Sequence, residues 1–273
     1  MSRLIRDILV VCGLERALLT PDGELLPCNF ETVRLFLTMG GRFSVVSEKT
    51  SAALEPYKSL LKMTSPALVS GGSVLYDYNK EKNVKSYILP ERTSRKIISD
   101  VQKNFRNVGI MAYADNARIY QIAATEGLQD LLLQCGEGWA AVADENLPIG
   151  LNKILFTGAE DALYQVRELI AARQYPGLFY SKPENNVLAV LPMNASKQNA
   201  LQDLCSFTGV PLENTYVIAG AHDVLPYLEM GNHAVVTADA PTEIRAEADE
   251  QIGESVGGSV GQFLYQLIRS YEK

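Results

Sequence analysis

The chain has 273 residues, of which 47% are hydrophobic and 21% are charged, and its formal net charge is -7. This length and hydrophobic content are typical of a globular protein with one large or two medium domains. The negative charge comes without a basic stripe, which argues against nucleic acid or an anionic membrane as the main partner.

Targeting and metal signals are missing from the sequence. No apolar run reaches the roughly 18 residues that a membrane helix needs, and charges come too early in the N-terminal stretch for a signal peptide core. We therefore expect a cytoplasmic protein. The cysteines show no CxxC spacing and only two histidines accompany them, so neither a zinc site nor a disulfide framework is indicated. We expect buried free thiols at Cys12, Cys28, Cys135 and Cys205.

The first part of the chain alternates strand and helix patterns. The apolar runs predict strand, helix, strand and then a hairpin over residues 7–12, 32–39, 43–47, 67–70 and 73–78. The hairpin turns at Gly71-Gly72, because paired glycines supply the positive φ angles of a tight turn. Alternating units of this kind imply a parallel sheet, whose ligands bind at the carboxyl ends of its strands.

A polar crossing over residues 79–85 precedes a second, mixed pattern. It predicts helices and strands over residues 91–105, 108–113, 118–123, 126–135, 153–156, 159–173 and 187–191. The first pattern then resumes, with elements predicted over residues 197–209, 216–220, 224–230 and 234–237. We therefore expect an α/β fold: a Rossmann-like core domain formed by residues 1–85 and 190–273, with an α/β cap domain, 86–189, inserted into it.

Residues 9–19, Leu-Val-Val-Cys-Gly-Leu-Glu-Arg-Ala-Leu-Leu, have the outline of a phosphotransferase nucleophile loop. They resemble the first motif of the haloacid dehalogenase-like superfamily, Asp-x-Asp-Gly-Thr-Leu-Leu after a hydrophobic strand. In that motif the first Asp attacks phosphorus and the second is the general acid. Aligned without gaps on the two leucines, the motif puts Gly13 at the nucleophile, Glu15 at the acid and Arg16 at the glycine.

Further motifs follow in the order found in Cof-type, cap class IIB members of that superfamily. Where the family has Thr or Ser and then Gly-Arg, the chain has Ser47-Glu48-Lys49, although Ser47 also suits a helix cap. The family's Asn-Gly before the cap resembles Gly71-Gly72, which is a hairpin turn in either case. The best-preserved segment, Leu-Pro-Met-Asn-Ala-Ser-Lys-Gln-Asn-Ala-Leu, ends at residue 201 and contains Lys197, which the resemblance makes the phosphoryl-neutralising lysine.

A lysine that opens a helix opposes the helix dipole. We therefore expect Lys197 to have a bound anion or an acidic neighbour, the alternative being a solvated surface lysine.

The family's last motif, Gly-Asp-x-x-Asn-Asp, binds magnesium through its acids. Here Gly220 replaces the first Asp and Asp223 falls on the asparagine, or a one-residue shift puts His222-Asp223 on Asn-Asp. Residues 234–249 and 257–260 also resemble the family's terminal segments.

The resemblance implies hydrolysis of small phosphorylated metabolites such as sugar phosphates, with magnesium as cofactor. Gly13 has no nucleophilic side chain, and carboxylates missing at Gly13 and Gly220 remove the two main magnesium anchors. Cys12 is not expected to replace the nucleophile, because neighbouring strand residues point to opposite faces.

We therefore expect a pseudophosphatase without a metal, which binds phosphate, a sugar phosphate or a protein partner. One alternative is a divergent or weakly active phosphatase that uses Glu15 or His222 as acid, with magnesium as its cofactor if it keeps the family's chemistry. Another is a purely structural subunit.

The ligand-binding residues follow from the same alignment. Ser47, Lys49, Gly72 and Lys197 remain as candidates to hold an anion. In the cap, polar or aromatic candidates for ligand selection are Tyr113, Arg118, Tyr120, Lys153 and Ser181, which are otherwise ordinary surface or strand residues.

Overall fold

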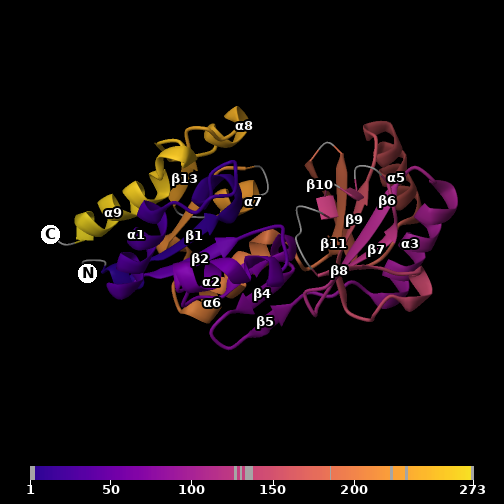
Figure 1. Cartoon of the computed structure of the whole chain (residues 1–273), viewed down its shortest axis with the longest axis horizontal. Helices are drawn as coiled ribbons and strands as arrows, with labels where there is room; N and C mark the ends of the chain where they lie inside the picture. The colour runs from indigo at the N-terminus through magenta and orange to yellow at the C-terminus, as the bar shows by residue number, and fades with distance from the viewer. Residues whose placement is uncertain are drawn as a thin grey trace. The chain divides into compact units, whose positions relative to one another are not determined.

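The computed structural model describes residues 4–125, 128–129, 131–132, 138–184, 186–221, 224–230 and 233–271. It divides the chain into two compact units (Figure 1). The first consists of Met1–Glu48, Glu55–Val84 and Lys197–Lys273, and the second of Lys49–Leu54 and Lys85–Ser196. Each unit contains one β-sheet together with helices, so the predicted α/β fold class is confirmed.

A largely parallel sheet organises the first unit. Its strand order is β14-β13-β12-β1-β2-β3-β4-β5, with parallel pairing from β14 to β3 and antiparallel pairing of β3 with β4. The strands are β1 Leu9–Gly13, β2 Arg42–Val46, β3 Ala67–Val69, β4 Val74–Asp77, β5 Lys82–Ser86, β12 Thr215–Ala219, β13 His233–Thr237 and β14 Glu250–Ile252.

Helices cover this sheet on both sides, which is why every residue of β1 is buried. The helices are α1 Pro27–Thr38, α2 Glu55–Leu61, α6 Lys197–Thr208, α7 Leu225–Leu228, α8 Thr242–Arg245 and α9 Ser259–Tyr271. Figure 1 shows α1 and α9 together on one side of the sheet and α6 on the other. Leu9 and Val11 of β1 pack against Leu204 of α6 and Tyr227 of α7 in one buried cluster.

The buried side chain of Asn29 ties three elements of the first unit together. Its Nδ2 donates to the Leu18 carbonyl, after β1, at 2.8 Å, and its Oδ1 accepts from the Gly261 N–H of α9 at 2.8 Å. Helices α1 and α9 approach closely here. The space between them would not hold a side chain at Gly261, since a Cβ there would lie 2.4 Å from the Cys28 carbonyl oxygen. The segment after β1 is thus anchored to both helices.

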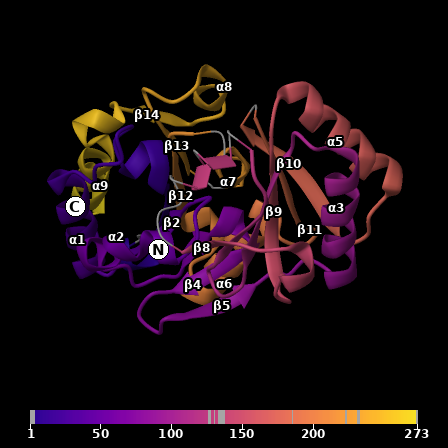
Figure 2. The same cartoon turned by 45° about the vertical axis from the view of Figure 1, so that its right-hand side comes forward.

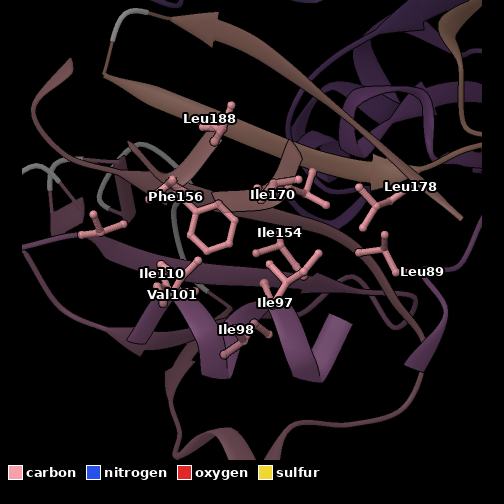
Figure 3. Packing of buried hydrophobic residues seen from close by; sticks show 14 of the residues in the cluster. Leu89, Ile97, Ile98, Val101, Ile110, Ile154, Phe156, Ile170, Leu178 and Leu188 are labelled. Carbon is pink, nitrogen blue, oxygen red and sulfur yellow. The ribbon is translucent and has the colours of Figure 1, made fainter. Parts of the chain in front are cut away.

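The second unit has a sheet of order β10-β11-β9-β6-β7-β8, antiparallel except for the β7–β8 pair. Helices α3 and α5 cover one face of it (Figure 2). The elements are α3 Glu91–Asn104, β6 Gly109–Ala114, β7 Ile119–Ala123, β8 Trp139–Ala141, β9 Leu151–Thr157, α5 Glu160–Arg173, β10 Leu178–Glu184 and β11 Val187–Pro192. Figure 3 shows Ile97 and Val101 of α3 beside Ile154 and Phe156 of β9 in the buried core.

Short 3-10 turns join these elements at Ile5–Asp7, Ala52–Leu54, Ser70–Gly72, Asp144–Asn146, Leu212–Asn214 and Ser255–Gly257. In the part of the chain that the structure describes, no helix has the length and apolar character needed to cross a membrane.

Several predicted elements need correction. The segment 79–85, predicted as a polar crossing, contains most of β5, an edge strand in which every residue except Val84 is polar. Helix α1 begins at Pro27, five residues before the predicted start, because proline suits the first helical turn. Strands β8, β10 and β14 were not predicted. The helix predicted over 126–135 lies largely outside the described residues.

The cysteines also differ in part from expectation. Cys12 and Cys205 are buried free thiols as predicted, but Cys28, in the first turn of α1, is exposed. Cys135 lies outside the described residues.

Replacing Asn29 by alanine should destabilise the protein. The change leaves the buried Leu18 carbonyl and Gly261 N–H without this partner, and an unsatisfied buried polar group costs about 1–3 kcal/mol. Urea denaturation followed by circular dichroism measures the loss. Asn104→Ala is the matched control, because its exposed side chain bonds only within α3 and should change stability by less than about 0.5 kcal/mol. Equal effects of the two substitutions would contradict the anchoring role of Asn29.

Candidate functional site

The carboxyl ends of neighbouring parallel strands bring four short segments together in the first unit. Strand β1 lies between β12 and β2, and β3 follows β2. The segments that leave these strands therefore meet at one edge of the sheet, which is where parallel α/β sheets bind ligands. Residues 14–18 follow β1, residues 47–48 follow β2, residues 70–72 follow β3, and Gly220 follows β12.

The segment after β1 forms one wide turn, Leu14–Leu18, closed by the Leu19 N–H, which donates to the Leu14 carbonyl at 2.9 Å. Within it, Arg16 has φ 61°, in the left-handed region that favours glycine. The motif alignment puts a glycine at this position. The backbone therefore has the conformation that the motif's glycine would adopt, with an arginine in its place.

Main chain fills the space beside Gly220. A Cβ on this glycine would lie 1.9 Å from the Arg16 carbonyl oxygen and 2.9 Å from the Ala17 nitrogen. A Cβ on Gly13 would meet Val224 Cγ2 at 2.9 Å, which is a side-chain contact. In this conformation of the wide turn, position 220 therefore has no room for any side chain, and position 13 has room only if Val224 moves.

Cys12, next to the position of the nucleophile, is fully buried and its thiol contacts the Gly13 carbonyl oxygen at 3.4 Å. Burial raises the pKa of the Cys12 thiol far above its ordinary value, because a thiolate there would lose its hydration. The thiol stays protonated and is a poor nucleophile.

Glu15 and Ser47 are brought together. The Ser47 hydroxyl donates to Glu15 Oε1 at 2.8 Å, and Ser47 is fully buried. The Glu15 carboxylate, at the acid position, thus accepts a hydrogen bond from the Ser47 hydroxyl, to which the resemblance assigns phosphate binding. This hydrogen bond links the segments after β1 and β2.

Lys197, the first residue of α6, forms an ion pair with Glu48, with 3.2 Å between Nζ and Oε1. Their side chains are 18% and 31% exposed, so water and salt screen this pair less than a surface pair. The Lys197 ammonium also lies 5.8 Å from the ring centroid of the buried Tyr227 in α7. Of the two partners expected for Lys197, an anion or an acidic neighbour, the structure contains the acidic neighbour.

Gly71 and Gly72 form the tight turn between β3 and β4, with φ 72° and 88°. A Cβ on Gly72 would lie 2.5 Å from the Tyr227 hydroxyl oxygen, and a Cβ on Gly71 would lie 2.8 Å from Glu48 Oε2. Both glycines are therefore required by their backbone angles and by the side chains that face them.

The other predicted site residues are not among these contacts. Lys49 belongs to the second unit, and Asp223 and His222 lie outside the described residues. In the second unit, the buried Lys153 ammonium lies 4.7 Å from the ring centroid of Tyr113. Tyr120 instead packs on the face covered by α3 and α5, and Arg118 and Ser181 are exposed.

Two residues of this site were not among the predicted ones. Glu48 stands where the family motif has glycine, and an acidic residue beside the retained Ser47 was the available signal. Tyr227 gave no such signal, because its contacts with Gly72 and Lys197 join segments far apart in the sequence.

The described residues do not fit a magnesium ion at this edge of the sheet. Magnesium needs oxygen ligands in octahedral array, and the two glycines supply none while leaving little room for a carboxylate. Among the described residues, no three acidic, histidine or cysteine side chains gather in a way that could hold a metal. The described polar side chains that meet at this edge include those of Ser47, Glu15, Glu48 and Lys197.

Over 268 residues, the chain is 22% identical to the pyridoxal phosphate phosphatase YbhA of Escherichia coli, and the match covers 95% of this chain and 98% of the relative. The structure matches a haloacid dehalogenase-like hydrolase of Bacteroides thetaiotaomicron with TM-score 0.85, at 17% identity over 95% and 99% of the two chains. A solved sugar phosphatase of haloacid dehalogenase subclass IIB matches with TM-score 0.79, at 11% identity over 95% and 98%.

A family model, that of the haloacid dehalogenase-like hydrolases, matches residues 10–264, which is most of the chain. The resemblance inferred from the motifs is thereby confirmed. This chain belongs to the haloacid dehalogenase-like hydrolase family.

Proposed function

We propose that the chain is a pseudophosphatase, a family member that binds a phosphorylated small molecule without hydrolysing it. The observation that carries this proposal is the contact at Gly220, where the Arg16 carbonyl takes the space of a metal-binding side chain. Phosphoryl transfer in the family needs a carboxylate nucleophile and a metal that bridges it to phosphate. The nucleophile position is also a glycine, and Cys12 is too deeply buried to replace it.

The retained polar groups suit binding better than chemistry. Lys197 supplies a charge for phosphate and Ser47 a hydroxyl, and neither attacks phosphorus in the family's reaction. Two of the relatives named above are a pyridoxal phosphate phosphatase and a sugar phosphatase. We therefore propose a small phosphorylated metabolite as the ligand.

A weakly active phosphatase is the second candidate, because one carboxylate survives at the acid position. Glu15 Oε1 accepts a hydrogen bond from the Ser47 hydroxyl in this arrangement. A water-driven hydrolysis would need Glu15 to transfer protons without a covalent intermediate. If Glu15 carries the hydrolysis, the Glu15→Gln variant should lose turnover, whereas the activity of a contaminating phosphatase would remain.

The wild-type protein should not hydrolyse phosphomonoesters above background. A panel that includes pyridoxal phosphate and sugar phosphates, assayed with and without magnesium, measures released phosphate. An active family member assayed in parallel shows that the conditions support catalysis. Turnover by the purified wild type that Glu15→Gln abolishes would contradict the pseudophosphatase proposal.

Magnesium and EDTA should leave the melting temperature unchanged. A ligand that binds the folded state raises stability in proportion to the logarithm of its concentration over its dissociation constant, and the described residues offer magnesium no such site. Differential scanning fluorimetry over a magnesium titration tests this. A rise with magnesium that EDTA reverses would show a metal site.

Restoring aspartates at 13 and 220 should not restore activity. A side chain at 220 meets the Arg16 carbonyl at 1.9 Å, so the wide turn must move, and overpacking of this kind costs about 1–3 kcal/mol or more. We expect Gly220→Asp, alone or with Gly13→Asp, to lower the melting temperature without magnesium-dependent turnover.

Gly257→Asp is the matched control for that experiment, because a Cβ at Gly257 has no atom within 4 Å. It should melt close to the wild type. A double variant that melts like the wild type and turns over phosphate esters with magnesium would show that the turn adapts freely.

A further inference from the structure

Glu48 and Gly71 are a matched pair of substitutions. In the motif alignment Glu48 replaces a glycine and Gly71 replaces an asparagine. A Cβ on Gly71 would lie 2.8 Å from Glu48 Oε2 and 3.3 Å from Oε1. A side chain at 71 and the Glu48 carboxylate therefore compete for the same space, and glycine at 71 leaves that space to the carboxylate.

The carboxylate placed there contacts the one cation of the family's phosphate-binding set that lies in the described first unit. Glu48 Oε1 lies 3.2 Å from the Lys197 ammonium, at ion-pair and hydrogen-bond distance. Ser47, the residue before Glu48, donates to a second carboxylate, Glu15, at 2.8 Å. The carboxylates of Glu15 and Glu48 thus contact Ser47 and Lys197, the two groups to which the resemblance assigns phosphate binding.

We infer that Glu48 is a built-in counter-ion that occupies the place of the anion on Lys197 and weakens the binding of inorganic phosphate there. The inference rests on the proposed binding function. Phosphate that binds Lys197 has to displace the Glu48 carboxylate, which would otherwise repel it at short range.

The test is the affinity for inorganic phosphate, measured by isothermal titration calorimetry on the full chain. Glu48→Gln keeps the shape of the side chain and removes its charge. It should bind inorganic phosphate at least about tenfold more tightly than the wild type, because like charges at short range cost several kcal/mol. Adding Lys197→Gln to Glu48→Gln should abolish the gain.

Glu81→Gln is the matched control, because Glu81 also pairs with a lysine, Lys58, at 2.7 Å, but on the exposed surface. It should bind phosphate like the wild type, and circular dichroism melts should show all variants folded. Equal phosphate affinity of wild type and Glu48→Gln, or a gain that survives Lys197→Gln, would overturn the inference. Ester turnover by the wild type would refute the pseudophosphatase proposal instead, so the two failures are distinct.

Discussion

The contact of the Arg16 carbonyl with Gly220 is the constraint on which the rest of the site depends. It brings the wide turn after β1 against the end of β12, two neighbouring strands of the parallel sheet. Main chain, unlike a flexible side chain, cannot yield without moving the turn, and Asn29 holds the end of that turn against α1 and α9. The conformation of the turn and the absence of a side chain at 220 therefore require each other.

Near that contact, the polar side chains of Ser47 and Lys197 have partners within the chain. Ser47 bonds to Glu15, and Lys197 pairs with Glu48. A catalytic site in this family must keep such groups available for a phosphoryl group and a metal. Here they form internal pairs, which link the segments after β1 and β2 and the start of α6.

The parts that the sequence predicted well are those with local signals. The buried runs of β1 and β2 and the amphipathic helices α3, α5 and α6 have clear periodicity, and the motif order identified the family. The edge strand β5 was missed because four of its five residues are polar, with Val84 the exception, so its sequence lacks a strand pattern. The importance of Glu48 was missed for another reason: its partner Lys197 is 149 residues away, so only the fold brings them together.

The crowding between position 71 and the Glu48 carboxylate makes these two positions interdependent. A side chain at 71 would push the carboxylate from its present place, where Oε1 lies 3.2 Å from the Lys197 ammonium. Substitutions of residues in contact are generally not additive, so changes at 48 and 71 should have coupled effects on stability.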